Sequence, residues 1–197
     1  MTADSHLRWK TLRERPLLDG YVFRVYSATR RSGDGREAEF YLLDSDNWVH
    51  VIAEVNNADG VPCFVMVRQY RHGEQEVTIE FPGGVVDPDE DPAAAALREL
   101  QEETGFTADG VLEIGRTNPN PALMNNRAIT YFARGVHSIQ AEQSLDANEI
   151  VDVELVPVED ILAGRRRDFT SHAIMVAAIY WYLLHTGRID GSGVGSV

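Results

Sequence analysis

Cysteine is nearly absent from this sequence, and basic residues are few. Cys63 is the only cysteine among 197 residues, so the chain can form no internal disulfide and no thiolate metal cluster. Lys and Arg number 18 against 31 Asp and Glu, which gives a net charge of −13. Non-specific nucleic-acid binding and docking on anionic membranes both need clustered positive charge, so we expect neither partner. The low cysteine content fits a reducing compartment, and we expect a cytoplasmic protein.

Long hydrophobic runs are also missing. The longest apolar run, 173–184, is short of the ~20 residues that span a bilayer, so we expect a buried helix there. Residues 1–15 are polar and charged without an apolar core, so we expect a polar arm and no signal peptide. With 44% hydrophobic and 25% charged residues, a chain of this length can bury a core, which excludes wholesale disorder.

Hydrophobic periodicity predicts a mixed α/β domain in which helices pack on the faces of a mixed β-sheet. Strands are predicted at 21–26, 39–43, 49–55, 61–69, 77–81, 111–116, 127–136 and 150–156. Helices are predicted at 92–104, 158–163 and 171–185. We expect three parts, namely a β-rich N-terminal segment at 1–47, a main domain at 48–186 and a flexible tail at 187–197.

The helix predicted at 92–104 has clear start and stop signals. Asp91 can cap its first turn, and Pro92 suits the first helical position because its missing N–H needs no partner there. Gly105 suits the left-handed residue that ends a helix. Apolar or small residues recur at spacings of three and four and form one stripe, made of Ala93, Ala96, Leu97, Leu100 and Thr104.

Three glutamates on this helix share a face. Glu99, Glu102 and Glu103 stand at i, i+3 and i+4, where like charges repel by a few tenths of a kcal/mol per pair (~0.2–0.5). A hard divalent cation would relieve the repulsion, and oxygen ligands without Cys or His favour Mg²⁺, Mn²⁺ or Ca²⁺ over zinc. The alternative interpretation is a solvated acidic helix face.

The residues around the helix favour a ligand site. Gly83 and Gly84 follow a predicted strand, and glycine at such a place lets the backbone approach a ligand closely. Arg98 lies beside the acidic face and can pair with Glu90 in the preceding loop. We expect this pair to fix how the loop meets the helix.

The segment 84–106, GVVDPDEDPAAAALRELQEETGF, resembles the Nudix box. That box reads Gly, five residues, Glu, seven residues, Arg-Glu, an aliphatic residue, any residue, Glu-Glu, any residue, Gly and an aliphatic or aromatic residue. Every fixed position is filled in this sequence, by Gly84, Glu90, Arg98, Glu99, Leu100, Glu102, Glu103, Gly105 and Phe106. So many specified positions in one short segment make a chance match very rare.

The resemblance extends beyond the box, over about 20–185. The segments VRQYR at 67–71 and IEFPG at 79–83 are similar to the ADP-ribose and nucleoside-diphosphate-sugar pyrophosphatase branch of the Nudix family. A β-rich N-terminal segment and a closing helix rich in Ala, Ile, Tyr and Trp fit the same branch. The resemblance implies the Nudix fold and a metal-dependent pyrophosphohydrolase.

The resemblance also implies a set of metal ligands. Glu99 and Glu103 match the main ligands, Glu102 matches a further ligand, and Glu102 and Glu103 thereby share in catalysis. The backbone carbonyl of Gly83 matches a position that ligates metal in related enzymes. The implied cofactor is Mg²⁺, with Mn²⁺ as an alternative.

Residues outside the box match substrate and catalytic positions of the branch. Arg71 matches an arginine that contacts substrate phosphates, and Glu80 matches a residue that lines the site. The general base of this branch often lies on an acidic loop after the last core strands. Glu149 is the residue we expect in that role, with Asp146 or a box glutamate as alternatives, because Ala147 stands where a second acid is common.

Further substrate contacts are expected from two other segments. The loop 118–127 contains two prolines and four asparagines, so it can line a pocket wall, and Asn125 and Asn126 could bond a sugar or base. In the resembling branch, aromatic residues of the N-terminal segment stack on the base and the segment crosses to a partner chain. Phe40 is the aromatic residue we assign to that role, and we expect a homodimer.

The leading function hypothesis is hydrolysis of a nucleoside diphosphate-sugar, above all ADP-ribose to AMP and ribose 5-phosphate. A second hypothesis keeps the chemistry but changes the substrate to GDP-mannose, another nucleotide sugar or a dinucleotide. A third is a non-catalytic sensor that binds such a nucleotide. The complete set of three glutamates disfavours the sensor, since a pure binder does not need three metal ligands.

Overall fold

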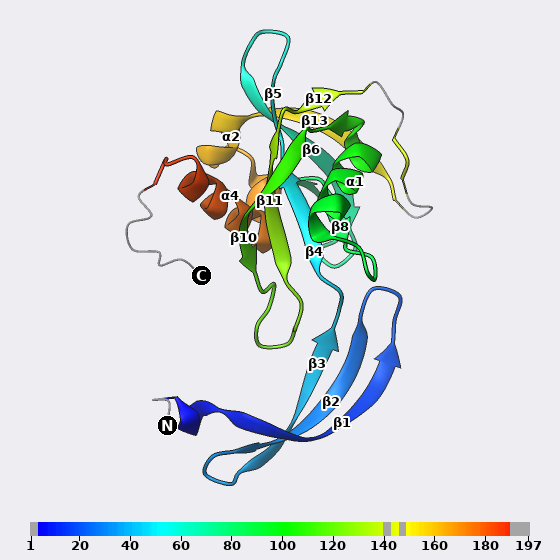
Figure 1. Ribbon diagram of the computed structural model, residues 1–197, viewed down its shortest axis with the longest axis vertical. Helices are drawn as coiled ribbons and strands as arrows, with labels where there is room; N and C mark the ends of the chain where they lie inside the picture. Colours follow the sequence, from blue (N-terminus) through cyan, green and yellow to red (C-terminus); the bar gives the residue numbers. More distant parts are fainter. Residues whose placement is uncertain (1–3, 140–142, 146–148, 190–197) are drawn as a thin grey trace. The chain divides into compact units, whose positions relative to one another are not determined.

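The structure is a computed structural model that describes residues 4–139, 143–145 and 149–189. The chain forms two compact units, drawn in Figure 1. The N-terminal unit consists of residues 1–46 with 118–127, and the main unit consists of 47–117 with 128–197. The main unit contains the whole glutamate-bearing helix, so it is the unit that positions the candidate site.

The N-terminal unit is built on one antiparallel sheet. Its strands β1 (Trp9–Asp19), β2 (Arg24–Ser32) and β3 (Glu37–Asp44) pair in the order β1-β2-β3, after a short 3-10 turn at Ser5–Leu7. The predicted polar arm at 1–15 is therefore wrong from Trp9 onwards. All eleven residues of β1 are exposed, so the strand is held by its backbone ladder to β2 and leaves no buried face for a sequence pattern to reveal.

Two sheets form the centre of the main unit. In one sheet the order is β10-β11-β4-β8; in the other it is β13-β6-β5, with β7 paired to β6. Only the β11–β4 pair is parallel among these ladders of the described residues, so the first sheet is mixed and the second is antiparallel. The strands are β4 (Trp48–Ile52), β5 (Glu54–Asn56), β6 (Pro62–Arg71), β7 (Glu76–Glu80), β8 (Gly83–Val85), β10 (Gly110–Thr117), β11 (Ala128–Arg134) and β13 (Val151–Pro157), and two short strands, β9 (Phe106–Thr107) and β12 (His137–Ser138), pair with each other.

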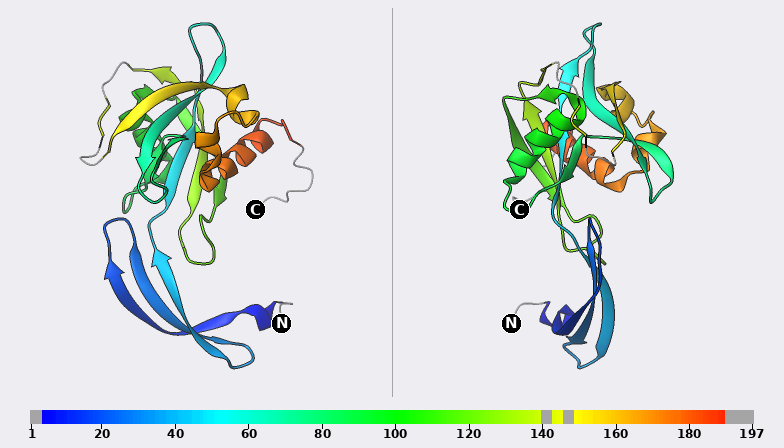
Figure 2. Two further views of the ribbon diagram at one scale, coloured as in Figure 1. Left: turned by 180° about the vertical axis from the view of Figure 1, so that it is seen from behind. Right: turned by 90° about the vertical axis from the view of Figure 1, so that its right-hand side faces the viewer.

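Helices cover both sides of these sheets. In Figure 2, α1 (Pro92–Thr104) lies on one side, and α2 (Val158–Leu162) and α4 (Ala173–His185) lie on the other, with α3 (Arg167–Thr170) just before α4. The mixed α/β class and the sandwich of sheet between helices are thus confirmed. The predicted helix at 171–185 is present as α4, which begins two residues later, and the short α3 before it was not predicted. No helix of the described residues is long and apolar enough to cross a membrane.

The core has two clusters because β6 is buried on both faces. Phe64 and Met66 belong to the cluster under α4, while Val65 belongs to the cluster under α1. Successive strand residues point to opposite sides of a sheet, so a continuous apolar run serves both helix layers. The apolar run in α4 is a packed helix, as predicted, and its Ala178 and Tyr182 are buried in the first cluster.

Helix α1 begins and ends as its sequence predicts. The Asp91 carboxylate accepts hydrogen bonds from the backbone N–H groups of Ala93 (2.9 Å) and Ala94 (3.1 Å). Pro92 occupies the first turn, and Gly105 ends the helix in the left-handed region with φ 68°. This fixed start and end set the rotation of the helix, and hence the direction of its glutamates.

Candidate active site

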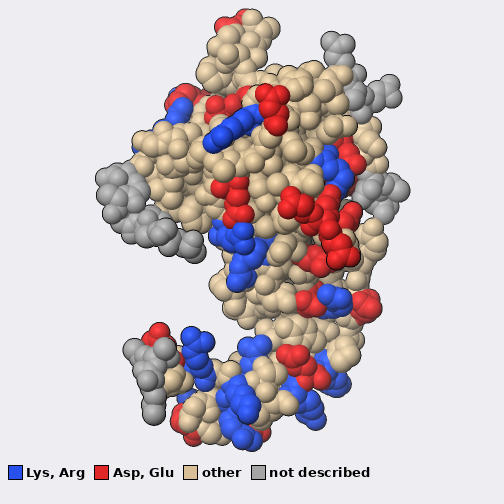
Figure 3. Space-filling view, in the orientation of Figure 1, with Lys and Arg blue, Asp and Glu red and all other residues tan. Residues whose placement is uncertain are grey.

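An acidic pocket lies beside α1 in the main unit. It has a volume of about 50 Å³ and is lined by Arg98, Glu99, Glu102, Glu103, Ser144 and Glu149. Figure 3 shows carboxylates gathered over α1 and β8 on this face of the unit. Four glutamates around one small pocket leave a large excess of negative charge, which a cation can neutralise.

Glu103 is the most deeply buried of the box glutamates. The residue is 2% exposed, and its carboxylate accepts a hydrogen bond from the backbone N–H of Gly83 at 2.8 Å. Burial, together with the charges of Glu99 and Glu149, raises the pKa of Glu103 to about 8 against the lowering effect of the Gly83 bond. Glu103 is thus buried although its sequence position predicted a carboxylate on the acidic face, because its side chain lies against the backbone of β8.

Glu99 stands against the backbone of Gly84. A Cβ atom at Gly84 would overlap the Glu99 carboxyl group, so only glycine leaves room for this side chain. Burial raises the pKa of Glu99, although the charge of Arg98 opposes that shift. The second glycine of the pair predicted from the sequence thus makes space for a carboxylate.

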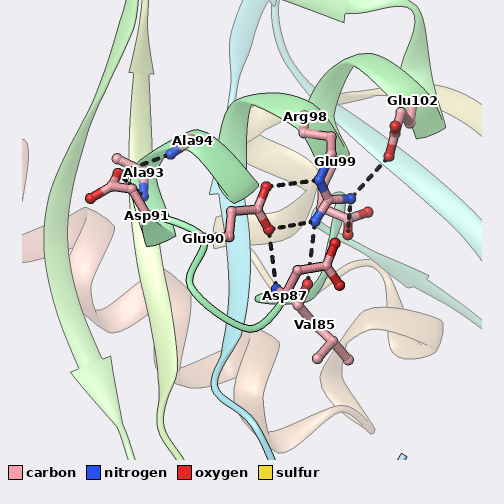
Figure 4. Close-up of polar contacts among 9 residues, drawn as sticks. All are labelled: Val85, Asp87, Glu90, Asp91, Ala93, Ala94, Arg98, Glu99 and Glu102. Carbon is pink, nitrogen blue, oxygen red and sulfur yellow. Dashed lines mark hydrogen bonds and ion pairs between the residues drawn. The ribbon is translucent and has the colours of Figure 1, made fainter.

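Arg98 connects the loop before α1 to the acidic face. Figure 4 shows its guanidinium group between Glu90 and the helix glutamates. Nε donates to Glu90 at 3.0 Å, which confirms the predicted pair, and Nη1 donates to Glu99 at 2.9 Å and to Glu102 at 3.0 Å. Arg98 therefore also compensates part of the negative charge of the pocket, a role that the sequence did not predict.

The donor set of this pocket fits a divalent cation of the hard type. Carboxylate oxygens are the anionic ligand atoms of its lining, and burial with the charges of Glu99 and Glu149 disfavours the ionised form of Glu103 until a cation binds. Within the described residues, however, no three acidic, His or Cys side chains are already gathered around one point. Glu99 and Glu102 turn to Arg98 instead, so a cation would compete with the guanidinium for these two carboxylates.

Arg71 and Glu80 form a second polar group beside this pocket. The Arg71 side chain is 43% exposed and holds the Glu80 carboxylate, which is 1% exposed, through Nε at 2.7 Å and Nη2. Burial would raise the pKa of Glu80, but the bonds from Arg71 and His172 lower it to about 2. The charges of Glu103 and Glu149 contribute to raising the pKa of Arg71, so the guanidinium lies within the electrostatic reach of the pocket.

The loop that bears Glu149 is attached to the end of α1. The Gln143 side chain donates to the backbone carbonyls of Glu103 and Val151, and the Ser144 N–H donates to the carbonyl of Glu102. Glu149 lines the pocket, whereas Asp146 lies outside the described residues. The sequence analysis missed Gln143 and Ser144, because neither residue type marks an anchoring role without the fold.

Three expected substrate contacts belong to the N-terminal unit. Asn125 donates to Asp44 at 2.6 Å and Asn126 donates to the carbonyl of Asp46 at 3.1 Å, so both amides brace the loop 118–127 within that unit. Asn126 is 3% exposed. Phe40 packs edge-on against Trp9, with ring centroids 5.3 Å apart. Contact of these three residues with a substrate stays a prediction.

Comparison with known proteins identifies the family. The NUDIX domain model matches residues 46–177, about two thirds of the chain. The chain is 27% identical to the ADP-ribose pyrophosphatase of Bacillus subtilis (strain 168) over 156 residues, which are 79% of this chain and 82% of that protein. It is also 27% identical to the "Methanol dehydrogenase activator" of Bacillus methanolicus over 153 residues, 78% of this chain and 80% of the relative.

A solved structure shares the fold. The crystal structure of an ADP compounds hydrolase superimposes with a TM-score of 0.75 and 22% identity, over 92% of this chain and 97% of the other. Together with the filled box on α1 and the acidic pocket beside it, these matches show that the chain belongs to the NUDIX domain family, as a hydrolase related to ADP-ribose pyrophosphatase.

Proposed function

We propose that this protein is a metal-dependent pyrophosphohydrolase that cleaves ADP-ribose to AMP and ribose 5-phosphate. The observation that carries the proposal is the pocket of four glutamates with Arg71 in electrostatic reach. Such a site suits a cation–diphosphate pair, because the carboxylates attract the cation and the guanidinium attracts the phosphate oxygens. The name of the Bacillus subtilis relative, matched over most of both chains, supports ADP-ribose as the substrate.

Glu99, Glu102, Glu103 and the backbone carbonyl of Gly83 are the residues that we propose to hold the cation. Mg²⁺ is the proposed ion, with Mn²⁺ as the alternative, since both accept all-oxygen ligand sets. When bound, such an ion neutralises phosphate charge and lowers the pKa of bound water. In the protein itself, Glu103 keeps one oxygen fixed by the Gly83 N–H, and Arg98 holds the loop before α1 in place.

Arg71 and Glu149 have separate roles in this proposal. Arg71 binds the diphosphate and is held in place by its two bonds to Glu80. Glu149 accepts a proton from the water that attacks phosphorus, while the bond from that phosphorus to the bridging oxygen breaks. The alternative base is a box glutamate, because Glu103 has a raised pKa and lines the same pocket.

The N-terminal unit supports the proposal of a homodimer. Its sheet leaves large apolar side chains exposed, among them Leu12 (40%), Leu18 (57%) and Tyr41 (59%). A second copy of the chain would cover this surface, and Phe40 and Asn125 would then contribute to recognition of the base and sugar. Light scattering at micromolar concentration should give twice the mass of one chain, and a monomeric mass would contradict the dimer.

Hydrolysis of a nucleotide panel tests the function. Wild type and Glu103→Gln are incubated with ADP-ribose, GDP-mannose and a dinucleotide, each with Mg²⁺ and with Mn²⁺, and AMP or other products are separated by chromatography. The proposal predicts that ADP-ribose is turned over fastest and that the variant loses this activity. Preference for another nucleotide would keep the chemistry and change the substrate. Tight binding without any turnover would instead indicate the sensor.

A further inference from the structure

The Glu80 carboxylate is fully occupied by hydrogen-bond donors from the protein. Its Oε1 accepts from Arg71 Nε at 2.7 Å and from the Thr78 hydroxyl, and its Oε2 accepts from Arg71 Nη2 and lies 3.3 Å from His172 Nε2. A carboxylate offers about four acceptor sites, so three hydrogen bonds and the His172 contact occupy all of them. Glu80 thus supports Arg71 and has no oxygen left for a metal or for a substrate proton.

His172 reaches Glu80 from another part of the chain. It is the residue that precedes α4, where a Ser, Thr, Asp or Asn side chain commonly caps the helix. Its side chain makes no capping bond and instead approaches Glu80 with an exposed fraction of 20%. A residue that breaks a local rule while making a specific distant contact marks a functional position.

The backbone around His172 is fixed. Its N–H donates to Phe169 at 3.2 Å, and its carbonyl accepts from Val176 at 3.1 Å. One turn along α4, the Met175 sulfur accepts the N–H of Phe81, the residue next to Glu80, at 3.2 Å. The first turn of α4 is therefore attached to the Glu80–Phe81 segment at two points, so the imidazole is held rigidly enough to orient a carboxylate.

Resting on the proposed function, we infer that His172 is a positioning residue, which orients Arg71 for the substrate diphosphate by holding the far side of Glu80. Without His172, Glu80 Oε2 loses one of its two donors and the Arg71–Glu80 pair can rotate. Among the described residues no acceptor binds Arg71 Nη1, so this nitrogen is the donor available to a phosphate. The role needs only a proton on Nε2, which one neutral tautomer and the cation both provide.

A double-mutant cycle tests whether His172 acts through Arg71. His172→Leu should raise the KM for ADP-ribose about tenfold with kcat changed by less than about twofold, since a phosphate contact stabilises substrate and transition state alike. His172→Gln, whose amide nitrogen can replace Nε2, should restore the wild-type KM. In an Arg71→Ala background, His172→Leu should have no further effect. His185→Leu, at the other end of α4, is the matched control.

Two outcomes would overturn the inference. One is a wild-type KM in His172→Leu, and the other is an equal loss with and without Arg71, which would show that His172 acts independently. A readout that needs no activity is the Arg71 Nε–H signal in a ¹⁵N NMR spectrum, assigned with Arg71→Lys and compared between wild type and His172→Leu. We expect a resolved signal in slow exchange in wild type and faster exchange in His172→Leu, and equal exchange in the two proteins would contradict the inference. If wild type cleaves no nucleotide, the proposed function fails while this comparison still decides the role of His172.

Discussion

Two glutamates of the main unit are equally buried and have opposite surroundings. Glu80 is 1% exposed and Glu103 is 2% exposed. Glu80 accepts three hydrogen bonds from Arg71 and Thr78 and lies 3.3 Å from His172 Nε2, and its pKa is lowered to about 2. Within the described residues, the Glu103 carboxylate accepts a hydrogen bond from the Gly83 N–H and faces the charges of Glu99 and Glu149, and its pKa is raised to about 8 mainly by burial.

The comparison separates a supporting carboxylate from a ligand. A buried carboxylate with all its partners inside the protein contributes to the fold and orients what it binds. A buried carboxylate among like charges is destabilising unless something positive binds there. Burial alone would not have distinguished the two roles. The number of hydrogen-bond donors and the sign of the neighbouring charges do distinguish them.

The largest effect is expected at Glu103. Glu103→Gln should lower kcat for ADP-ribose with Mg²⁺ by roughly 10³-fold, because a lost ligand removes charge stabilisation of about 4 kcal/mol. Steady-state AMP release measures this loss, and Glu159→Gln, a change of the same type at an exposed side chain of α2, is the control. Activity within about tenfold of wild type would remove Glu103 from the proposed ligands.

Substitution of the two glycines of β8 should affect activity in one case and folding stability in the other. In Gly84→Ala the new Cβ meets only the end of the Glu99 side chain, so we expect normal folding and a loss of activity of roughly 10- to 100-fold. In Gly83→Ala the Cβ meets backbone, 2.7 Å from His50 Cα, so we expect a loss of about 1–3 kcal/mol of stability. Thermal unfolding and AMP release on both variants check this, and equal stability losses would contradict it.

Acid should remove the stabilising contribution of Glu80. Its folded pKa of about 2 lies below the ordinary value of 4.5, so its stabilising contribution is complete above pH 4.5 and is lost as the pH falls towards 2. Glu80→Gln should cost about 2 kcal/mol at pH 7 and flatten this acid limb. Melting temperatures between pH 7 and pH 3 in EDTA measure the effect. Parallel acid limbs in variant and wild type would be incompatible with this account.

The smallest effect is expected at the far end of α1. Asp91→Ala removes the N-cap and should lower stability by about 1 kcal/mol, or roughly 2–4 °C in melting temperature. Activity at a temperature well below melting should be unchanged, because Asp91 does not line the pocket. A large loss of activity would mean that the cap, and not only the glutamates, determines the site.

Local features of the site were predictable from the sequence. The caps of α1, the end at Gly105 and the Arg98–Glu90 pair follow from residue types at short spacings, and each is present. The Nudix resemblance rested on the same segment, and the family comparison confirms it. Interactions within one helix and its adjoining loop depend little on the rest of the chain, which is why the sequence suffices for them.

The rest depends on the packing of distant segments. The sequence did not predict β1, because no face of this strand is buried. It did not predict β8 either, because a strand of this length is too short for an alternating pattern. Contacts between elements produce the burial of Glu103 and the approach of His172 to Glu80. Competition between possible partners decides that Arg98 also bonds Glu99 and Glu102. Sequence spacing cannot rank such competing partners, so these contacts required the three-dimensional structure.

Thermal unfolding at pH 8.5 of wild type, Glu103→Gln and Glu80→Gln, in EDTA and in Mg²⁺, tests the central claim most directly. The folded pKa of Glu103, about 8, exceeds the ordinary value of 4.5, so metal-free wild type loses stability as the pH rises from 4.5 to about 8. The account predicts that Glu103→Gln melts above wild type in EDTA. It also predicts that Mg²⁺ raises the melting temperature of wild type and Glu80→Gln but not that of Glu103→Gln. A Glu103→Gln protein that melts below wild type in EDTA and responds equally to Mg²⁺ would contradict the account.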